Sequence, residues 1–253
     1  KLLEAAQAKT PANSVFQKRI ALIADFVQPL KQLQAQLAKG RKDVPELRVT
    51  AGNAKEFVLD GKLDDKFWQG VPAQGLRHLE TGKAPTSATS FKAVWAGESL
   101  YLAITCKDAD TKTLNIGTKK NGDDSLWNGD CVEVLLETQA HSYYQLVINP
   151  AGARIDLERR DGVLNRRWLS GAEMATHIGT GEWTVEMRIP VVPEANLDPL
   201  SGVAGRRPTD LYPWYANICR QRVRGKDIEL SAFSPTGKND FHDVLKFGKL
   251  VIR

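Results

Sequence analysis

Short runs of alternating apolar and polar residues, separated by turn residues, follow one another from about residue 46 to the end of the chain. Two pairs of runs predict β-hairpins: Phe91–Trp95 with Leu100–Cys106, and Val132–Leu136 with Tyr143–Ile148. Further strands are predicted at Leu47–Thr50, Arg154–Leu157, Ala172–Ile178, Trp183–Ile189, Trp214–Gln221, Ile228–Ala232 and Phe247–Ile252. Because no helical periodicity separates these runs, the sequence predicts a mainly β fold, an antiparallel β-sandwich.

The first 45 residues have a different period. Asn13 or Ser14 can cap a helix, and Gln17 completes a capping box with Ser14. Apolar residues then recur at spacings of three and four, which indicates one apolar helix face. We therefore expect an α-helical hairpin over residues 1–45 and a β-sandwich over residues 46–253.

The chain begins at Lys1 rather than at a methionine, inside a helical pattern. We therefore expect it to be a fragment, with residues 1–45 forming the end of an upstream domain. No stretch approaches 18 consecutive apolar residues, so we expect no membrane span in this sequence.

The chain carries a net charge of +5, which raises the question of nucleic-acid binding. Its arginine pairs and the run Arg220, Arg222 and Arg224 are far apart and interleaved with acidic residues, and no nucleic-acid-binding motif accompanies them. We interpret these arginines as solvated loop and strand-edge residues and expect no nucleic-acid partner.

Three cysteines, an odd number without a CxxC motif, lie among β-type residues: Cys106, Cys131 and Cys219. They are typical of small buried strand residues rather than of a disulfide framework or a zinc site. The sequence leaves open whether two of them are bridged.

No motif of a known catalytic class is present: there is no GxSxG, GxGxxG, HExxH or phosphate-binding loop. The four histidines are scattered without metal-ligand spacing. Carboxylates are numerous, but no two of them stand out as a glycosidase pair. We therefore predict a non-catalytic chain.

One segment combines the two chemical features that a sugar site needs. Flat rings stack on the C–H faces of a pyranose, and planar polar groups bind its hydroxyls. Trp127 lies in a polar loop before a strand, and Glu133 follows on that strand with Val132 and Val134 on the opposite face. Two interpretations stay open: a sugar site, or a tryptophan that closes the sandwich edge beside a surface carboxylate.

Five segments carry an ordered set of motifs, from "DG-x-hydrophobic-D-x-x-x-W" at the start to "F-x-D-x-x-x-F-G-x-L" at the end. They are Phe57–Trp68, Ala93–Ile104, Trp127–Glu133, Trp183–Pro190 and Phe241–Leu250. Together these segments resemble the family 9 carbohydrate-binding modules. The resemblance implies a jelly-roll-like β-sandwich that holds the end of a sugar chain between two aromatic rings.

Carried over residue by residue, the resemblance makes Trp127 the first ring and Phe241 the second. Glu133 is then the acidic ligand of the sugar hydroxyls, and Asn149 matches an amide on the neighbouring strand. The expected site also includes three further polar or cationic residues: Gln145, His242 and Arg220. The tryptophans Trp68, Trp95 and Trp183 fall in structural parts of the pattern and are assigned to the core.

Two positions depart from the family pattern. Val147 stands where the resemblance places an arginine, and Cys219 stands where an amide is expected. An alternative function follows from these departures: a structural sandwich that packs on a missing catalytic domain and binds no sugar. A third hypothesis, haem binding, has only Met174, Met187 and His177 as candidate axial ligands.

Some members of this family hold structural calcium, and four aspartates offer hard oxygen ligands for it here: Asp60, Asp64, Asp108 and Asp130. No cofactor is otherwise expected. The N-terminal segment looks similar to the end of glycoside-hydrolase-like multidomain proteins. That resemblance implies an upstream catalytic domain as partner and a secreted, periplasmic or cell-surface location in a polysaccharide-degrading bacterium.

Overall fold

The structure of the 253-residue chain is a computed structural model, which describes residues 14–15, 17–23, 41, 43–139, 142–160, 163–193, 196, 198 and 200–253. Two compact units, Lys1–Asp43 and Val44–Arg253, make up the chain. In the first, residues 17–23 are helical, and the backbone N–H of Gln17 donates to Oγ of Ser14 over 3.1 Å. This bond confirms Ser14 as a helix cap, whereas the rest of the predicted hairpin lies outside the described residues. None of the described helices has the length and apolarity that a membrane crossing requires.

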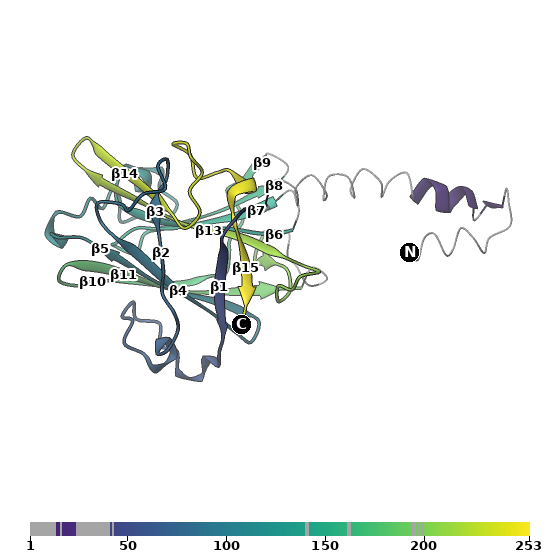
Figure 1. Cartoon of the computed structure of the whole chain (residues 1–253), viewed down its shortest axis with the longest axis horizontal. Coiled ribbons are helices and arrows are strands. Elements are labelled where there is room, and N and C mark those ends of the chain that lie inside the picture. The colour runs from purple at the N-terminus through teal and green to yellow at the C-terminus, as the bar shows by residue number, and fades with distance from the viewer. Residues whose placement is uncertain are drawn as a thin grey trace. The chain divides into compact units, whose positions relative to one another are not determined.

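The described part of the second unit consists of strands, arranged in two layers and connected by loops and short 3-10 helices (Figure 1). The first layer has the order β10-β11-β5-β4, and the second β13-β6-β7-β8-β9. The first contains β4 (Thr89–Ala96), β5 (Ser99–Lys107), β10 (Glu173–Ile178) and β11 (Glu182–Val192). The second contains β6 (Cys131–Gln139), β7 (Ser142–Ile148), β8 (Arg154–Arg160), β9 (Val163–Asn165) and β13 (Trp214–Arg224). The mainly β sandwich predicted from the alternating pattern is confirmed.

The two layers are joined by β1 (Glu46–Ala51) and β15 (Gly248–Ile252), which lie side by side in Figure 1. Both pairings of β1 are parallel, with β15 on one side and β4 on the other. The remaining short strands are β2 (Gln74–Gly75), β3 (Arg77–His78), β12 (Val203–Ala204) and β14 (Asp227–Ala232). Among them β12 also pairs in parallel, with β11, so the pairing is antiparallel except at these places.

The core lies between the layers and takes alternate residues from each central strand. Leu102 and Ile104 of β5 face Val134 and Leu136 of β6 in one apolar cluster. Trp68, Trp95 and Trp183 are all buried, as the sequence predicted. Removing apolar surface from water contributes roughly 25 cal/mol per Å², so this shared core is a main source of stability for the sandwich.

The sulfur-containing residues belong to this packing. Cys106, Cys131 and Cys219 are buried and free, and burial raises the pKa of the Cys106 thiol to about 11. Met174 and Met187 are paired across β10 and β11, and both pack in the core. This packing accounts for the two methionines considered as haem ligands.

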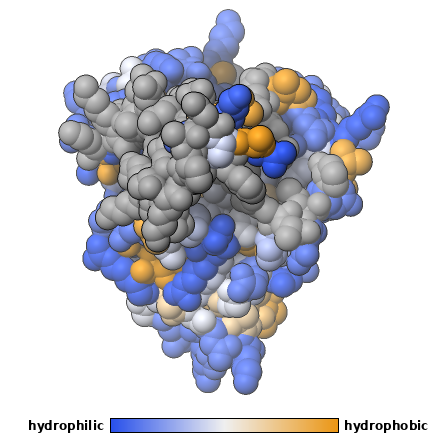
Figure 2. Space-filling view, turned by 90° about the vertical axis from the view of Figure 1, so that its right-hand side faces the viewer, coloured by the Kyte–Doolittle hydropathy of each residue, from blue (hydrophilic) through white to orange (hydrophobic). Residues whose placement is uncertain are grey.

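The described surface has no single dominant apolar region on the side shown in Figure 2, where small hydrophobic groups are scattered among hydrophilic residues. Large exposed apolar residues come from separate segments, among them Val58, Val163, Leu169 and Leu211. The polar residues are therefore the better candidates for a functional site.

Candidate functional site

The candidate site lies on the outer face of the layer that contains β13, β6, β7 and β8. Glu133 of β6 is paired with Cys219 of β13 on one side and with Val147 of β7 on the other. Because Val132 and Val134 belong to the core, the side chain of Glu133 projects from the opposite, outer face. The two positions that depart from the family pattern are thus the cross-strand neighbours of the predicted acidic ligand.

Glu133 is a buried carboxylate with a donor on each oxygen. The indole Nε1–H of Trp127 donates to Oε1 over 2.9 Å, and the amide Nε2–H of Gln145 donates to Oε2 over 2.6 Å. Only 4% of Glu133 is exposed. Burial raises the pKa of this carboxyl above its ordinary value, although the bonds from Gln145 and Trp127 oppose the rise. The structure therefore brings together three of the predicted site residues.

A chain of polar contacts continues from Gln145 across the same face. The Nε–H of Arg159 donates to Oε1 of Gln145 over 3.0 Å, and the Arg159 guanidinium carbon lies 5.9 Å from the centre of the Tyr143 ring. The Tyr143 hydroxyl lies 3.0 Å from Nδ1 of His242. Burial and the charge of Arg159 lower the pKa of His242 below its ordinary value. His242, predicted as a site residue, thus joins the chain at its far end.

Trp127 is held by its backbone as well as by its indole. It lies in the short 3-10 helix η4 (Asp124–Asn128), is partly exposed, and packs against the outer-face cluster that includes Val147 and Ile155. The side-chain amide of Gln221 on β13 donates to the carbonyls of Trp127 and Gly129, over 2.6 and 2.9 Å. The outer-face cluster therefore supports one side of the indole. Because the indole is partly exposed, some of its ring surface is left for a ligand.

Phe241, expected as the second stacking ring, is placed differently. It is 7% exposed and packs in a separate outer-face cluster with Leu135, Cys219 and Phe247. A ring buried to this extent offers little area for stacking on a sugar. The structure therefore assigns Phe241 to packing. Trp127 and Tyr143 are partly exposed rings on this face, and so is Tyr215 of β13, which packs against the cluster that contains Phe241.

This assignment gives a prediction. Phe241→Leu should lower the melting temperature, because it removes ring contacts from a buried cluster, at a cost of roughly 1–2 kcal/mol. It should leave the dissociation constant for any sugar within about twofold, since that ring has little exposed surface. Thermal unfolding and calorimetric titration of the same variant check both parts. A loss of affinity without a loss of stability would restore Phe241 as a stacking ring.

Asn149, expected as a sugar-binding amide, has its side chain fully occupied by the backbone. Its Nδ2 group donates to the carbonyls of Ile116 and Thr118, both over 2.7 Å, and its Oδ1 accepts from the N–H groups of Ala151 and Ala153. An amide has two donor hydrogens and two acceptor sites, and all four are used here. Asn149 therefore fixes the loop before Trp127 rather than offering groups to a ligand.

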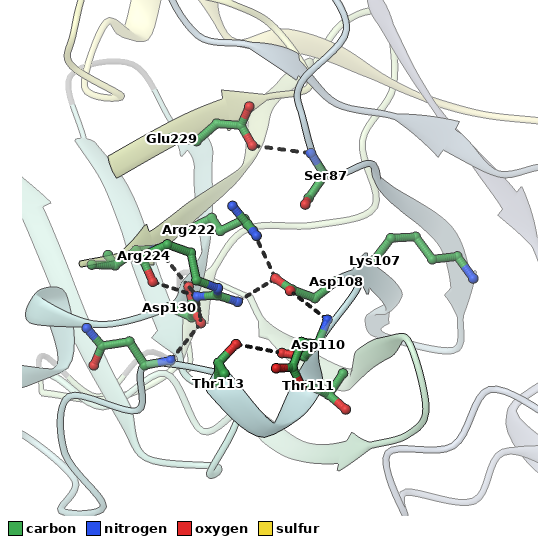
Figure 3. Close-up of polar contacts among 12 residues, drawn as sticks. Ser87, Lys107, Asp108, Asp110, Thr111, Thr113, Asp130, Arg222, Arg224 and Glu229 are labelled. Atoms are coloured by element: carbon green, nitrogen blue, oxygen red, sulfur yellow. Dashed lines mark hydrogen bonds and ion pairs between the residues drawn. The ribbon is translucent and has the colours of Figure 1, made fainter. Parts of the chain in front are cut away.

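Arg220 does not join Glu133, because it projects from the other face of β13. It is 1% exposed and donates to Asp108 over 3.3 Å and to the hydroxyl of Thr89 over 3.1 Å. Arg222 and Arg224, two and four residues further along, converge on the same Asp108 carboxylate (Figure 3). Arg224 also binds both oxygens of Asp130, over 2.9 and 2.6 Å. The arginine–aspartate cluster is our name for Arg220, Arg222, Arg224, Asp108 and Asp130.

The aspartates proposed for calcium do not fit a calcium site. Asp108 and Asp130 are bound by three guanidinium groups, whose positive charge disfavours a divalent cation. The carboxylate of Asp60 accepts from the backbone of Lys62, and no described group of three or more acidic, histidine or cysteine side chains is arranged to hold a metal ion. The calcium prediction is therefore not supported by these residues, Asp64 included.

Four residues that make defined polar contacts in the structure are not predicted from the sequence as site residues. Arg159 and Tyr143 were not singled out, yet they are paired in register across β7 and β8. Arg222 and Arg224 were interpreted as solvated. One signal was available: residues of Arg220-Gln221-Arg222-Val223-Arg224 alternate between basic and other side chains, the period of a strand with a charged face.

A partly exposed indole, a buried carboxylate and a linked amide thus lie together on the outer face of this β-sandwich. Residues 59–253 match the family described as "Carbohydrate family 9 binding domain-like", and the chain belongs to that family. No curated protein matches the chain in sequence.

Solved structures agree with this assignment at the level of the fold. One is a putative carbohydrate-binding protein from Bacteroides uniformis, with a TM-score of 0.64 and 18% identity over 83% of this chain and 99% of the other. Two others are family 9 carbohydrate-binding modules from Caldicellulosiruptor kristjanssonii, each 16% identical. The glucose complex has a TM-score of 0.56 and covers 82% of this chain and 95% of the other. For the cellotriose complex the values are 0.58, 82% and 93%.

Proposed function

We propose that this chain is a non-catalytic module that binds an uncharged mono- or oligosaccharide, or the end of a polysaccharide chain, on the outer face around Glu133. The observation that carries the proposal is the Glu133 carboxylate, buried beside a partly exposed indole and bonded to Trp127 and Gln145. Each carboxylate oxygen has a second lone-pair site that can accept a hydrogen bond from a sugar hydroxyl. The neighbouring indole offers an apolar face for the pyranose C–H groups.

The proposed affinity is modest. A hydrogen bond to a charged group contributes about 1.5–3 kcal/mol, and a stacked ring on the order of 1 kcal/mol beyond its burial. Lost translational and rotational freedom takes back several kcal/mol. Dissociation constants between about 1 µM and 1 mM are therefore expected. Glucose and cellotriose, which the two Caldicellulosiruptor modules bind, are the first probes to use.

The wider context that we propose rests on family membership. A carbohydrate-binding module acts by holding a larger protein on its substrate, so a catalytic domain upstream in the same protein is the expected partner. A glycoside hydrolase or a related polysaccharide-degrading protein fits this role. Such a protein meets polysaccharide outside the cytoplasm, which favours a secreted, periplasmic or cell-surface location.

Glu133→Gln tests the proposed contact directly. We expect glucose or cellotriose binding to weaken about tenfold, which is about 1.4 kcal/mol, because the variant loses the charged acceptor. The new amide would also direct a donor at the amide of Gln145. Isothermal titration of both proteins against the same sugars measures the effect. An unchanged dissociation constant would show that Glu133 does not contact the ligand.

A second candidate function has one observation in its favour. Val147 and Cys219, both buried, flank Glu133 where polar ligands would strengthen a sugar site. In this alternative the module is structural and packs on another domain. Wild-type protein that gives neither heat nor thermal shift with glucose, cellotriose, xylo-oligosaccharides and uronic-acid-containing oligosaccharides would favour it.

A further inference from the structure

The outer face has an unusual distribution of polar groups around Glu133. Its two cross-strand neighbours are apolar, and Asn149 is committed to the backbone. Polar capacity lies instead in the direction of Gln145, two residue pairs further along β6 and β7. For a ligand that contacts Glu133, a second polar contact on this face is therefore available along the line from Gln145 to Arg159.

Arg159 has donor groups that the described part of the chain does not use. A guanidinium carries five N–H donors in a planar fork, and within the described residues only the Nε–H of Arg159 is engaged, with Gln145. Neither terminal amino group of Arg159 has a hydrogen-bond or carboxylate partner within the described ranges, and the side chain is partly exposed. A partly exposed guanidinium beside a buried carboxylate, with no ion pair to any residue that the structure describes, is available for a ligand.

The position of Arg159 is nevertheless fixed. Its Nε is tied to Gln145, and its guanidinium lies within cation–π range of the Tyr143 ring, at 5.9 Å. Tyr143 is in turn fixed by its hydroxyl contact with His242. Such preorganisation reduces the side-chain entropy that is lost when Arg159 contacts a ligand.

We propose that Arg159 is a direct sugar ligand, and that it acts with Glu133 to recognise two hydroxyl groups of one uncharged sugar. The proposal rests on the function proposed above. Glu133 accepts a hydrogen bond from one hydroxyl, while the terminal amino groups of Arg159 donate hydrogen bonds to the oxygen of another. Gln145 sets the spacing between the two, because its amide nitrogen is bonded to Glu133 and its oxygen to Arg159.

The charges on this face favour an uncharged ligand over an acidic one. Arg159 carries one positive charge, and the Glu133 carboxylate lies only two hydrogen bonds away along Gln145. A sugar carboxylate placed against Arg159 would therefore meet Glu133 at short range, and the attraction and the repulsion would largely cancel. Glucuronic acid should bind no more tightly than glucose.

The test combines protein variants with altered sugars. Wild-type chain, Arg159→Gln and Arg159→Lys are titrated with glucose, glucuronic acid and the series of monodeoxyglucoses. Arg188→Gln is the matched control, since Arg188 is also partly exposed but lies on β11 in the other layer and pairs with Glu173. Thermal unfolding of each variant is measured alongside.

We expect Arg159→Gln to weaken glucose binding about tenfold, Arg159→Lys to recover part of this loss, and Arg188→Gln to have no effect. For one monodeoxyglucose, the one that lacks the contacted hydroxyl, wild type and Arg159→Gln should bind equally. An equal loss with every deoxy sugar would mean that Arg159 acts only through Gln145, which overturns the proposal, as would tighter binding of glucuronic acid. Wild-type protein that binds no sugar at all would overturn the proposed function instead.

Discussion

Asp108→Asn is expected to lower the free energy of unfolding by about 3–5 kcal/mol, because it leaves buried arginines without their carboxylate. Arg220 and Asp108 are both about 1% exposed at their side chains, and Arg222 and Arg224 depend on the same acid. Among the described residues Nε of Arg220 has no partner, and the other bonds of this guanidinium go to uncharged groups, the Thr89 hydroxyl and the carbonyls of Ser87 and Lys107. Urea denaturation of wild type and variant measures the difference. A change of less than about 1 kcal/mol in the free energy of unfolding would contradict this prediction, because it would mean that the three arginines do not need the Asp108 charge.

Asp60→Asn is the matched control, because among the described residues the Asp60 carboxylate bonds to Lys62, and the substitution should change stability little. The effect of Asp108 should also depend on pH. Burial alone would raise its pKa, but the bond from Arg222 and the charges of Arg224 and Arg222 outweigh burial, so the pKa lies below its ordinary value. A depressed pKa contributes stability that is present above the unfolded value, about 3.9, and is lost as pH falls through the folded value. The difference between wild type and Asp108→Asn should therefore shrink below about pH 4.

Trp127→Ala is expected to have the largest effect on ligand binding. It removes both the stacking surface and the Nε1–H donor to Glu133, which together should weaken sugar binding about 100-fold. A dissociation constant between about 1 µM and 1 mM would then rise to between about 0.1 mM and 100 mM. Since Trp127 is only partly buried, the free energy of unfolding should fall by about 2 kcal/mol, less than for a core tryptophan.

Trp127→Phe separates these two contributions. It keeps a ring on the outer-face cluster but removes the donor to Glu133, so an intermediate loss of affinity is expected with nearly wild-type stability. Titration with glucose and cellotriose gives the affinities, and thermal unfolding gives the stabilities. If Trp127→Ala unfolds the module, or if it binds sugar as well as wild type, the tryptophan is a structural residue of the sandwich edge.

The strands were predictable because their pattern is local. Alternation over five to eight residues gave both central hairpins, and the capping box at Ser14 gave the start of a helix. Glu133 and Trp127 were predictable for a related reason, since they lie only six residues apart and the strand period places Glu133 opposite the core valines. The contact of Gln145 with Glu133 follows from hairpin register, which is also short-range information.

The remaining features depend on register between distant strands and could not be derived from local pattern. Arg159 reaches the site because β8 continues the sheet beyond β7, a neighbour relation that composition does not encode. Arg220 is 112 residues from Asp108 in sequence, so its burial and its partner were both hidden. Phe241 was assigned to the sugar site by motif position, but the cluster that buries it draws residues from several separated strands.

The parallel pairing of β1 has a consequence for how the module reaches its native state. β1 completes the connection between the layers only when it binds β15, and the paired residues Glu46 and Lys249 lie about 200 residues apart. Closure therefore waits for the last strand of the chain to be synthesised. Until then β1 presents an unpaired edge, and folding is expected to be slow and sensitive to C-terminal truncation. Removal of the final six residues should be more damaging than their small number suggests.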